Sequence, residues 1–440
     1  MSDQSVHPAI SKQATPTDSN NAISRRKVIQ MAGAAAASSL ISPTIFAATD
    51  KVFRIGFVSP ASGPLSMFAE PDLFVMEQVK KVVGNGLQVG ARRYPVEIYY
   101  RDSKSRPDVA AQQTRELITQ TRVDLVVASS TPATTNPVAD VCEALGVPCL
   151  TNDTPWQAHF FGRGGNPNKG FKWTYHFFWG MEDAITTFTA LWNKVPTNKR
   201  IGVLWPDDED GNAWADRKVG FPGILKEQGF DLVDPGRLGL DSMDYVGLVD
   251  RFQREEVEIL SGVIPPPFFQ QFWLTALTKG YKPKIATMAK ATEFPASLTP
   301  FQRNADGLSV EVWWSPKHPF NSGMTAQSSR DLAKEYIQAA GRNWTMPLGF
   351  KHALFEVAID ALLRSDGPGN KESIRRALAT TNYHSVVGTV NFQTGPVPNI
   401  SKTPLVGGQW DYRYRHLELL IVDNTGAPEI PLQARLRPIS

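Results

Sequence analysis

The repeating unit of the fold can be read in residues 123–150, which are VDLVVASSTPATTNPVADVCEALGVPCL. The apolar run Leu125–Ala128 predicts a buried strand, and the small polar residues 129–135 predict a loop. A helix is expected from that loop to Leu145, and residues 147–150 predict a second strand. A strand, a helix and another strand in this order predict two parallel strands joined by a helical crossover.

The same alternation continues on both sides of this unit. Further strands are predicted at 52–58, 94–100, 200–204, 231–233, 259–264 and 284–288. Further helices are predicted up to Val83 and at 108–121, 213–228, 245–254, 268–278 and 351–364, the last with an amphipathic pattern. Apolar strands that alternate with helices predict parallel sheets covered on both faces. The alternation is interrupted by aromatic extended runs at 171–179 and 313–320, so two α/β units are expected.

Length and composition limit the classes of function. The chain has 440 residues, 42% of them hydrophobic, which is enough for two domains. Its 46 basic and 43 acidic residues are nearly balanced, which argues against nucleic acid as a main partner, because that binding needs a concentrated basic surface. Outside the first 48 residues no apolar run reaches about 20 residues, so no integral membrane protein is predicted.

Residues 1–48 have the pattern of an export signal. A polar stretch leads to Ser24-Arg25-Arg26-Lys27, an Ala-rich apolar segment follows at 31–41, and small residues end the segment at Ala47 and Ala48. Paired arginines after a polar lead-in are typical of the twin-arginine type of signal. The alternative is a disordered tail followed by an Ala-rich helix. We therefore expect a mature chain that is free in the periplasm.

Signatures of catalysis and of cofactor binding are missing from the sequence. It contains no nucleophile elbow, zinc-protease motif, phosphate loop or dinucleotide fingerprint, so we expect neither an enzyme nor a cofactor. The acidic turn 207–211 resembles half a calcium loop, but its ligand spacing fails, and no metal site is expected. His159 and His176 are interpreted as structural residues. Cys142 and Cys149 are interpreted as two buried thiols, with a disulfide as the alternative.

Several segments, in the right order along the chain, resemble one known family, the leucine-binding-protein-like periplasmic solute-binding proteins of branched-chain amino acid importers. The segments are Phe53-Arg54-Ile55-Gly56, Ser62-Gly63-Pro64, Val123 to Thr135, Gly146-Val147-Pro148, the acidic turn before Gly211, and Gly388-Thr389-Val390-Asn391-Phe392. The resemblance implies two Rossmann-like α/β lobes with parallel sheets, joined by three crossing strands, the type I periplasmic binding fold. Lobe 1 is then expected at 51–176 plus 318–380 and lobe 2 at 177–317 plus 381–440, with the third crossing at 381–387.

The resemblance also implies where a solute binds. Strand-to-helix loops place helix N-termini beside a ligand, and Ser130, Thr131, Ala133 and Thr134 lie in such a loop, where they could hold a carboxylate or simply cap the helix. The other residues that the resemblance or their position assigns to the ligand site are Phe68, Asn152, Asp153, Thr154, Trp179, Asp210, Pro265, Lys290 and Trp314.

Lys290 distinguishes two hypotheses about the charge of the solute. It lies about where amino-acid binders carry the acid that pairs with the substrate's ammonium group, and a lysine there favours an anionic solute, aromatic acids included. Alternatively Glu293, Asp153 or Asp210 supplies that acid.

The expected function is therefore a periplasmic receptor of an ABC importer that captures an amino acid, an amide or an aromatic carboxylate. It is expected to act as a monomer and to deliver the solute to a membrane permease. The alternatives are a free ligand-sensing receptor for signalling and a hydrolase hidden in the cleft.

Overall fold

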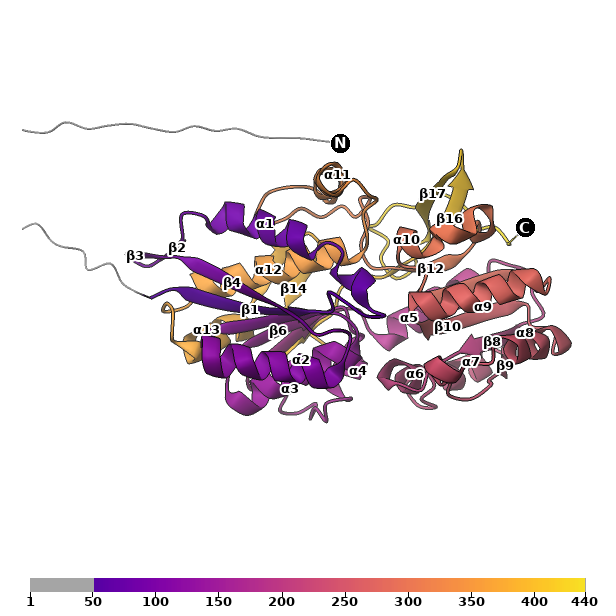
Figure 1. Cartoon of the computed structure of the whole chain (residues 1–440), viewed down its shortest axis with the longest axis horizontal. Helices are drawn as coiled ribbons and strands as arrows, with labels where there is room; N and C mark the ends of the chain where they lie inside the picture. Colours follow the sequence, from indigo (N-terminus) through magenta and orange to yellow (C-terminus); the bar gives the residue numbers. More distant parts are fainter. Residues whose placement is uncertain (1–50, 440) are drawn as a thin grey trace, which may run out of the picture. The chain divides into compact units, whose positions relative to one another are not determined.

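The computed structural model describes residues 51–439, and the predicted leader at 1–48 lies outside them. The described chain forms two large sheets, each with helices on both faces (Figure 1). We call the first sheet with its helices lobe 1 and the second sheet with its helices lobe 2. The predicted α/β class, with parallel sheets in two lobes, is confirmed.

The sheet of lobe 1 has six strands in the order β15-β7-β6-β5-β1-β4, and every neighbouring pair is parallel. Its strands are β1 (Phe53–Ser59), β4 (Val96–Asp102), β5 (Leu125–Ser129), β6 (Cys149–Asn152), β7 (Thr174–Phe177) and β15 (Ile400–Ser401). All residues of β5 are buried. Its unbroken apolar run follows from this position, because a strand covered on both faces has no solvent side.

Helices cover both faces of this sheet (Figure 1). On one face α1 (Asp72–Val83) contacts α12 (Pro347–Leu363), and on the other α2 (Pro107–Glu116) packs along α3 (Pro132–Leu145). The smaller elements of lobe 1 are η1 (Ser66–Ala69), β2 (Leu87–Val89), β3 (Arg92–Tyr94), η2 (Leu117–Thr121), α4 (Trp156–Phe160), α11 (Ser329–Ala340), α13 (Lys371–Ala379), β13 (Asn382–Ser385) and β14 (Gly388–Asn391).

The sheet of lobe 2 has seven strands in the order β17-β16-β12-β11-β10-β8-β9. The five strands from β9 to β12 are parallel, and β16 and β17 add an antiparallel hairpin at one edge. The strands are β8 (Arg200–Leu204), β9 (Asp231–Val233), β10 (Ile259–Ile264), β11 (Ile285–Lys290), β12 (Ser309–Val312), β16 (Val406–Arg413) and β17 (His416–Asp423). The helices are α5 (Met181–Trp192), α6 (Glu209–Trp214), α7 (Phe221–Glu227), η3 (Leu240–Ser242), α8 (Tyr245–Arg254), α9 (Pro266–Thr278), α10 (Pro295–Leu298) and η4 (Thr299–Ala305).

Two predicted helices differ from the structure. The helix expected at 213–228 is two helices, because the Asp216 carboxylate accepts the N–H groups of Lys218 and Val219 in a turn, and Pro222 starts α7 anew. Helix α12 is not amphipathic. Nearly all of its residues are buried, including Lys351, so it forms a central helix of lobe 1 rather than a surface helix.

The chain passes three times between the sheets. The first passage lies between β7 and α5 and the second follows β12. The third does not occur at the expected residues 381–387, which belong to the β13–β14 hairpin against α12. It follows β15, which pairs with β7 in lobe 1 before the chain enters β16 of lobe 2.

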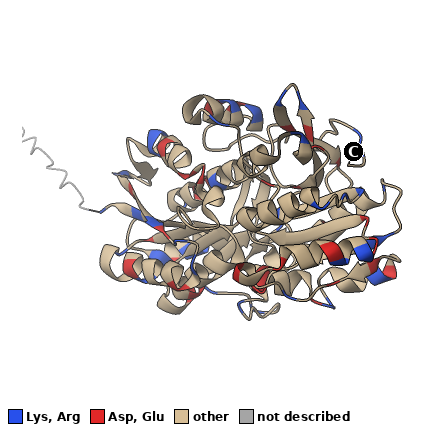
Figure 2. Ribbon diagram, turned by 45° about the vertical axis from the view of Figure 1, so that its right-hand side comes forward, with Lys and Arg blue, Asp and Glu red and all other residues tan. Residues whose placement is uncertain are grey.

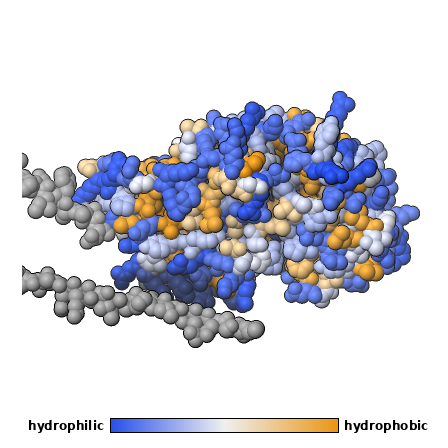
Figure 3. Space-filling view, turned by 45° about the horizontal axis from the view of Figure 1, so that its top comes forward, coloured by the Kyte–Doolittle hydropathy of each residue, from blue (hydrophilic) through white to orange (hydrophobic). Residues whose placement is uncertain are grey.

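The surface carries mixed charges and small apolar patches. Figure 2 shows acidic and basic residues interspersed over both lobes. On the face in Figure 3, apolar patches alternate with hydrophilic side chains. Among the described helices, none has both the length and the hydropathy that crossing a bilayer requires. Cys142 and Cys149 are buried free thiols.

Candidate functional site

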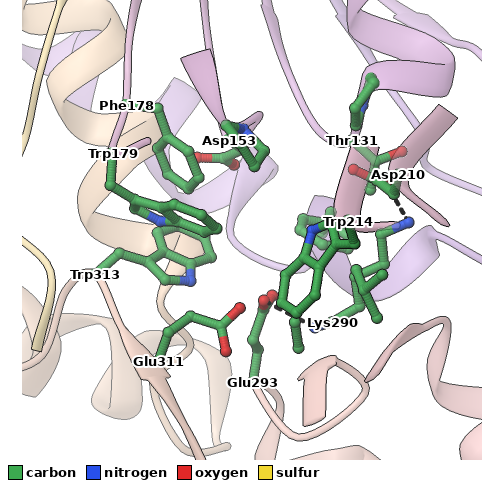
Figure 4. Close-up of a pocket in the computed structure, with 15 residues that line it drawn as sticks. Thr131, Asp153, Phe178, Trp179, Asp210, Trp214, Lys290, Glu293, Glu311 and Trp313 are labelled. Carbon is green, nitrogen blue, oxygen red and sulfur yellow. Dashed lines mark hydrogen bonds and ion pairs between the residues drawn. The ribbon is translucent and has the colours of Figure 1, made fainter. Parts of the chain in front are cut away.

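A cavity lies at the carboxyl ends of strands from both sheets (Figure 4). It leaves about 340 Å³ free of protein atoms, including the part open to solvent. This is where parallel sheets present loops and helix N-termini, and where ligands of open α/β folds bind. The lining residues are Phe68, Thr131, Pro132, Asp153, Pro155 and Phe178 from lobe 1, Asp210, Trp214, Val263, Ala289, Lys290, Glu293 and Glu311 from lobe 2, and Trp179 and Trp313 from the passages between the sheets.

The cavity brings together six of the residues predicted for the ligand site. They are Phe68, Thr131, Asp153, Trp179, Asp210 and Lys290. The others lie nearby without lining it, and these are Ser130, Ala133, Thr134, Asn152, Thr154, Pro265 and Trp314.

Residues outside the cavity hold its walls in place. Asn152 Nδ2 donates to the carbonyl of Phe350 at 2.9 Å, and Thr154 Oγ1 donates to the carbonyl of Ser130 at 2.8 Å. These bonds tie the loop after β6 to α12 and to the loop after β5. Pro265 precedes the first turn of α9 and does not reach the cavity.

The two consecutive tryptophans at the second passage, Trp313 and Trp314, face different surroundings. Trp313 lines the cavity, whereas Trp314 packs against Trp344 with ring centroids 5.9 Å apart. Consecutive residues of an extended chain point to opposite sides, so only one of the two can face the ligand site. The expectation that Trp314 faces the cleft is therefore corrected to Trp313.

Asp153 is the charged residue of the lobe 1 wall. It follows β6 with a left-handed backbone (φ 62°), which a residue other than glycine adopts only at an energetic cost and which turns its side chain into the cavity. Ser129 Oγ donates to Asp153 Oδ2 at 2.6 Å, while Oδ1 has no partner. Burial raises the pKa of Asp153 to about 7, although the nearby Lys351 opposes the rise.

Lys290 occupies the matching position in lobe 2. It ends β11, also with a left-handed backbone (φ 61°). Its ammonium group forms a short ion pair with Asp210 and lies 3.9 Å from Asp208. Burial lowers the pKa of Lys290, but the two aspartates outweigh that effect and the pKa is raised, so the side chain is charged. Its charge is already balanced by Asp210, which removes the reason to expect an anionic solute.

Two glutamates form the rest of the lobe 2 wall. Glu293 accepts the backbone N–H of Lys290 with Oε1 at 2.9 Å. Glu311 is fully buried in β12, and the hydrogen-bond partner of its carboxyl group is the Glu293 carboxyl group beside it. Figure 4 shows the two carboxyl groups pointing toward each other. Burial raises the pKa of Glu293 to about 7, and burial together with the neighbouring Glu293 raises that of Glu311 well above its ordinary value.

Aromatic rings form much of the remaining wall. The Phe178 ring lies 4.9 Å from Trp179 and 5.2 Å from Trp313, centroid to centroid. Trp214 faces them from lobe 2 (Figure 4). The indole N–H groups of Trp179, Trp214 and Trp313 are buried and have no acceptor. The cavity thus offers apolar faces, unpaired donors and unpaired carboxyl oxygens at once.

The two lobes touch around the cavity. Asn136 Nδ2 in α3 donates to Glu209 Oε2 in α6 at 3.1 Å. On another side the ring of Phe68 meets Phe294 of lobe 2, with centroids 5.0 Å apart. Contacts of this kind between lobes close the cavity over whatever lies inside it.

The sequence analysis missed several cavity residues. Glu311 is the most informative of them, because an acid in the apolar strand Ser309–Val312 has no structural reason to be there. The strand's alternation also places Glu311 and Trp313 on the same side, which was a usable signal. Trp214 carried no such signal, since it lies near the start of the helix predicted at 213–228.

Other titratable clusters are structural. The rings of His159 and His176 stack 4.1 Å apart, and burial lowers the pKa of both, so they are neutral. His176 contacts the Thr151 hydroxyl and the Thr154 carbonyl, which supports the loop after β6. Within residues 51–439 no group of three His, Cys, Asp or Glu side chains is arranged to hold a metal ion.

Solved structures with a similar fold include several solute-binding proteins. A leucine-binding protein from Thermotoga maritima is 17% identical, with a TM-score of 0.66 over 85% of this chain and 99% of its own. A solute-binding protein of an ABC transporter from R. palustris, in complex with 4-hydroxybenzoate, is 15% identical with a TM-score of 0.68 over 86% and 98%. A branched-chain amino acid transporter substrate-binding protein from Streptococcus pneumoniae, in complex with isoleucine, is 13% identical with a TM-score of 0.68 over 85% and 100%.

The sequence itself matches a family model. None of the curated proteins matches the chain. The model described as "Periplasmic binding protein" matches residues 52–399, which span both lobes. These matches confirm the predicted type I fold and the predicted resemblance. The chain belongs to the leucine-binding-protein-like periplasmic binding proteins.

Proposed function

We propose that this protein is the substrate-binding receptor of an ABC importer, which captures a small solute between its lobes and delivers it to a membrane permease. The observation that carries the proposal is the cavity between the lobes, lined from both sheets and containing buried polar atoms without partners. Such atoms are costly unless a ligand satisfies them. The solute-binding proteins that share the fold support the same role.

The receptor works by lobe closure. A solute that contacts Asp153 of lobe 1 and Glu311 of lobe 2 at once stabilises only the closed arrangement, so binding shifts the population toward it. The Asn136–Glu209 hydrogen bond also forms only when the lobes meet. A permease then distinguishes loaded from empty receptor by the closed surface. The protein acts as a monomer and is not an enzyme in this proposal.

The direct test is to identify what the protein retains. Protein purified without refolding is denatured, and the released small molecules are analysed by mass spectrometry. A thermal-shift screen of amino acids, amides, amines and aromatic acids follows, and deletion of the gene should abolish cellular uptake of the solute found. Chemical change of the solute during incubation, or uptake that does not depend on the protein, would contradict the proposal.

We also propose export to the periplasm by the twin-arginine route, on the basis of the Arg25-Arg26 pair. Replacing both with lysine should leave precursor in the cytoplasm. Normal periplasmic yield of that double variant would refute the assignment.

A further inference from the structure

The ionisable groups of the cavity are unbalanced. Four carboxyl groups line it, against one ammonium group. Lys290 and Asp210 neutralise each other. The other three acids, Asp153, Glu293 and Glu311, form no ion pair with any Lys, Arg or His among residues 51–439. Because the pKa values of Asp153 and Glu293 are about 7 and the raised pKa of Glu311 keeps that group protonated, the cavity carries a partial negative charge at pH 7.

These three carboxyl groups are also short of hydrogen-bond donors. Each residue is at most 5% exposed. Asp153 Oδ1 has no partner, and Glu293 and Glu311 share a hydrogen bond with each other besides the Lys290 N–H that Glu293 accepts. A buried carboxyl group without a counter-charge either keeps its proton, as the raised pKa values here indicate, or is compensated by a cationic group rich in N–H donors. An occupant with a cationic nitrogen would supply that compensation.

The aromatic walls fit such an occupant. Rings of Phe178, Trp179 and Trp313 line one side and Trp214 the other (Figure 4). Aromatic faces attract a desolvated cation, and tryptophan does so most strongly. The unpaired indole N–H groups add donors that suit a neutral oxygen, such as a hydroxyl or an amide carbonyl.

Among the side chains that line the cavity, a carboxylate on the occupant would find free donors only in the Thr131 hydroxyl and the indole N–H groups. Helix α3 begins with Pro132, which lacks the N–H that this position of a helix N-terminus would otherwise offer an anion. The Asp153 carboxyl group lines the cavity from the same lobe as Thr131. Both lobes thus present acids, which disfavour an anionic group when they are ionised.

We propose that the cavity takes a small organic cation without a carboxylate: an amine with an apolar body and a neutral oxygen, such as an amino alcohol. Glu293 and Glu311 bind its ammonium group, and the aromatic rings enclose its body. This inference rests on the proposed receptor function and specifies the class of its solute.

Two matched series of probes test the charge preference by titration calorimetry at pH 7. The aromatic series is 2-phenylethylamine, phenylalaninol, phenylalanine and 3-phenylpropanoate. The aliphatic series is 3-methylbutylamine, leucinol, leucine and 4-methylpentanoate. In at least one series the amine and the amino alcohol should bind at least about ten-fold more tightly than the amino acid, and the acid should not bind. Tighter binding of the amino acid or of the acid would overturn the proposal.

Variants test the assigned residues with phenylalaninol, or with leucinol if the aliphatic series binds. Glu311→Gln and Glu293→Gln keep the side-chain shape and should each weaken binding about ten- to a hundred-fold, the usual worth of a charge-assisted hydrogen bond. Glu227→Gln at the exposed end of α7 is the matched control and should bind like wild type. Wild-type affinity in both cavity variants would overturn the proposal, and each is informative alone if the other fails to fold.

The solute retained by the purified protein distinguishes failure of the receptor function from failure of the cation assignment. A retained amine without a carboxylate supports both the receptor function and the cation assignment. A retained or tightly bound carboxylate leaves the receptor function standing and overturns the cation assignment. If neither series binds and no solute is found in the protein or in the screen, both proposals fail.

Discussion

Each lobe contains a buried lysine paired with an aspartate, and the two pairs differ in how completely they are satisfied. Lys351 Nζ in lobe 1 lies 3.0 Å from Asp72 and donates to Ser59 Oγ and to the carbonyl of Ser129, both at 3.0 Å. Asp72 also accepts the Tyr100 hydroxyl at 2.7 Å. This network joins α1 and α12 to the ends of β1, β4 and β5. Both charges are paired and each residue forms at least one further hydrogen bond, although Asp72 Oδ1 meets only the ammonium group.

The pair in lobe 2 sits in an incomplete network. Lys290 meets Asp210 and, at longer range, Asp208, while Glu293 and Glu311 beside it share a hydrogen bond with each other but have no ion-pair partner within residues 51–439. A buried polar network that is fully satisfied makes the fold rigid, and one that is partly satisfied costs stability. The difference indicates that the first pair maintains the fold, whereas the second belongs to a surface that a ligand completes.

The largest expected effect comes from breaking the complete network. Lys351→Met leaves Asp72 buried without its cation and should lower the free energy of unfolding by about 3–5 kcal/mol, the cost of removing one partner of a buried pair. Urea denaturation at pH 7 measures this. The control is Lys334→Met, at an exposed position of α11, which should stay close to wild type.

A double variant sharpens that result. Asp72→Asn combined with Lys351→Met removes both charges and should recover part of the lost stability, because no uncompensated charge remains. If Lys351→Met is as stable as Lys334→Met, the lobe 1 network does not have the structural role assigned to it.

The incomplete network predicts an unusual dependence of stability on pH for the protein without solute. A carboxyl group whose pKa is raised on folding keeps its proton in the folded state after the unfolded chain has released it. Folding therefore binds protons in that window, and raising the pH favours unfolding. For Glu293, whose pKa moves from 4.5 to about 7, the loss between these pH values is on the order of 3 kcal/mol.

Glu293→Gln should remove that part of the slope. Free energies of unfolding measured from pH 4.5 to 8 should fall less steeply in this variant than in wild type, while Glu227→Gln should follow wild type. Wild-type stability that rises from pH 4.5 to 7 with the same slope in Glu293→Gln would show that Glu293 has a normal pKa.

The parallel sheets were predictable because their central strands are continuous apolar runs that alternate with helices along the chain. Runs such as Leu125–Ser129 and Ile259–Ile264 have no solvent face, so both α/β units were recognisable. The position of the third passage was not predictable, because the hairpin at 382–391 has the same extended pattern as a crossing segment. Helix α12 was predicted to be amphipathic because spacing alone does not reveal that its charged residues are buried, with Lys351 paired to Asp72 of α1 and Glu356 beside His352.

The lining of the cavity was only partly predictable. Asp153 and Lys290 were expected in it from the family resemblance. The pairing of Lys290 with Asp210 was not predictable, although both residues were singled out, because it depends on how two loops from separate strands meet in space. Alternation places Glu311 and Trp313 on one side of their strand, but which cavity that side faces depends on distant segments.

Removing Lys290 distinguishes the two charge hypotheses. If the solute is a cation, Lys290→Met removes a like charge and leaves the Asp210 carboxylate without its partner, so phenylalaninol or leucinol binding should strengthen by about 1 kcal/mol, roughly five-fold, while the solute-free protein loses stability. If the solute is an anion, the same change should weaken binding of 3-phenylpropanoate or 4-methylpentanoate about ten- to a hundred-fold. Calorimetry on wild type and on Lys290→Met, with Lys334→Met as control, decides between them.

The smallest effect is expected at the contact between the lobes. Glu209 accepts the Asn136 amide across the gap, yet it is exposed and has no other hydrogen bond within the described chain. Glu209→Ala should therefore leave stability unchanged and weaken solute binding by about 0.5–1 kcal/mol, two- to five-fold, because only the closed form loses a bond. Titration of the solute into Glu209→Ala and into Glu227→Ala, whose side chain is exposed and far from the contact along the chain, measures the difference. Equal affinities would mean that this hydrogen bond accompanies closure without stabilising it.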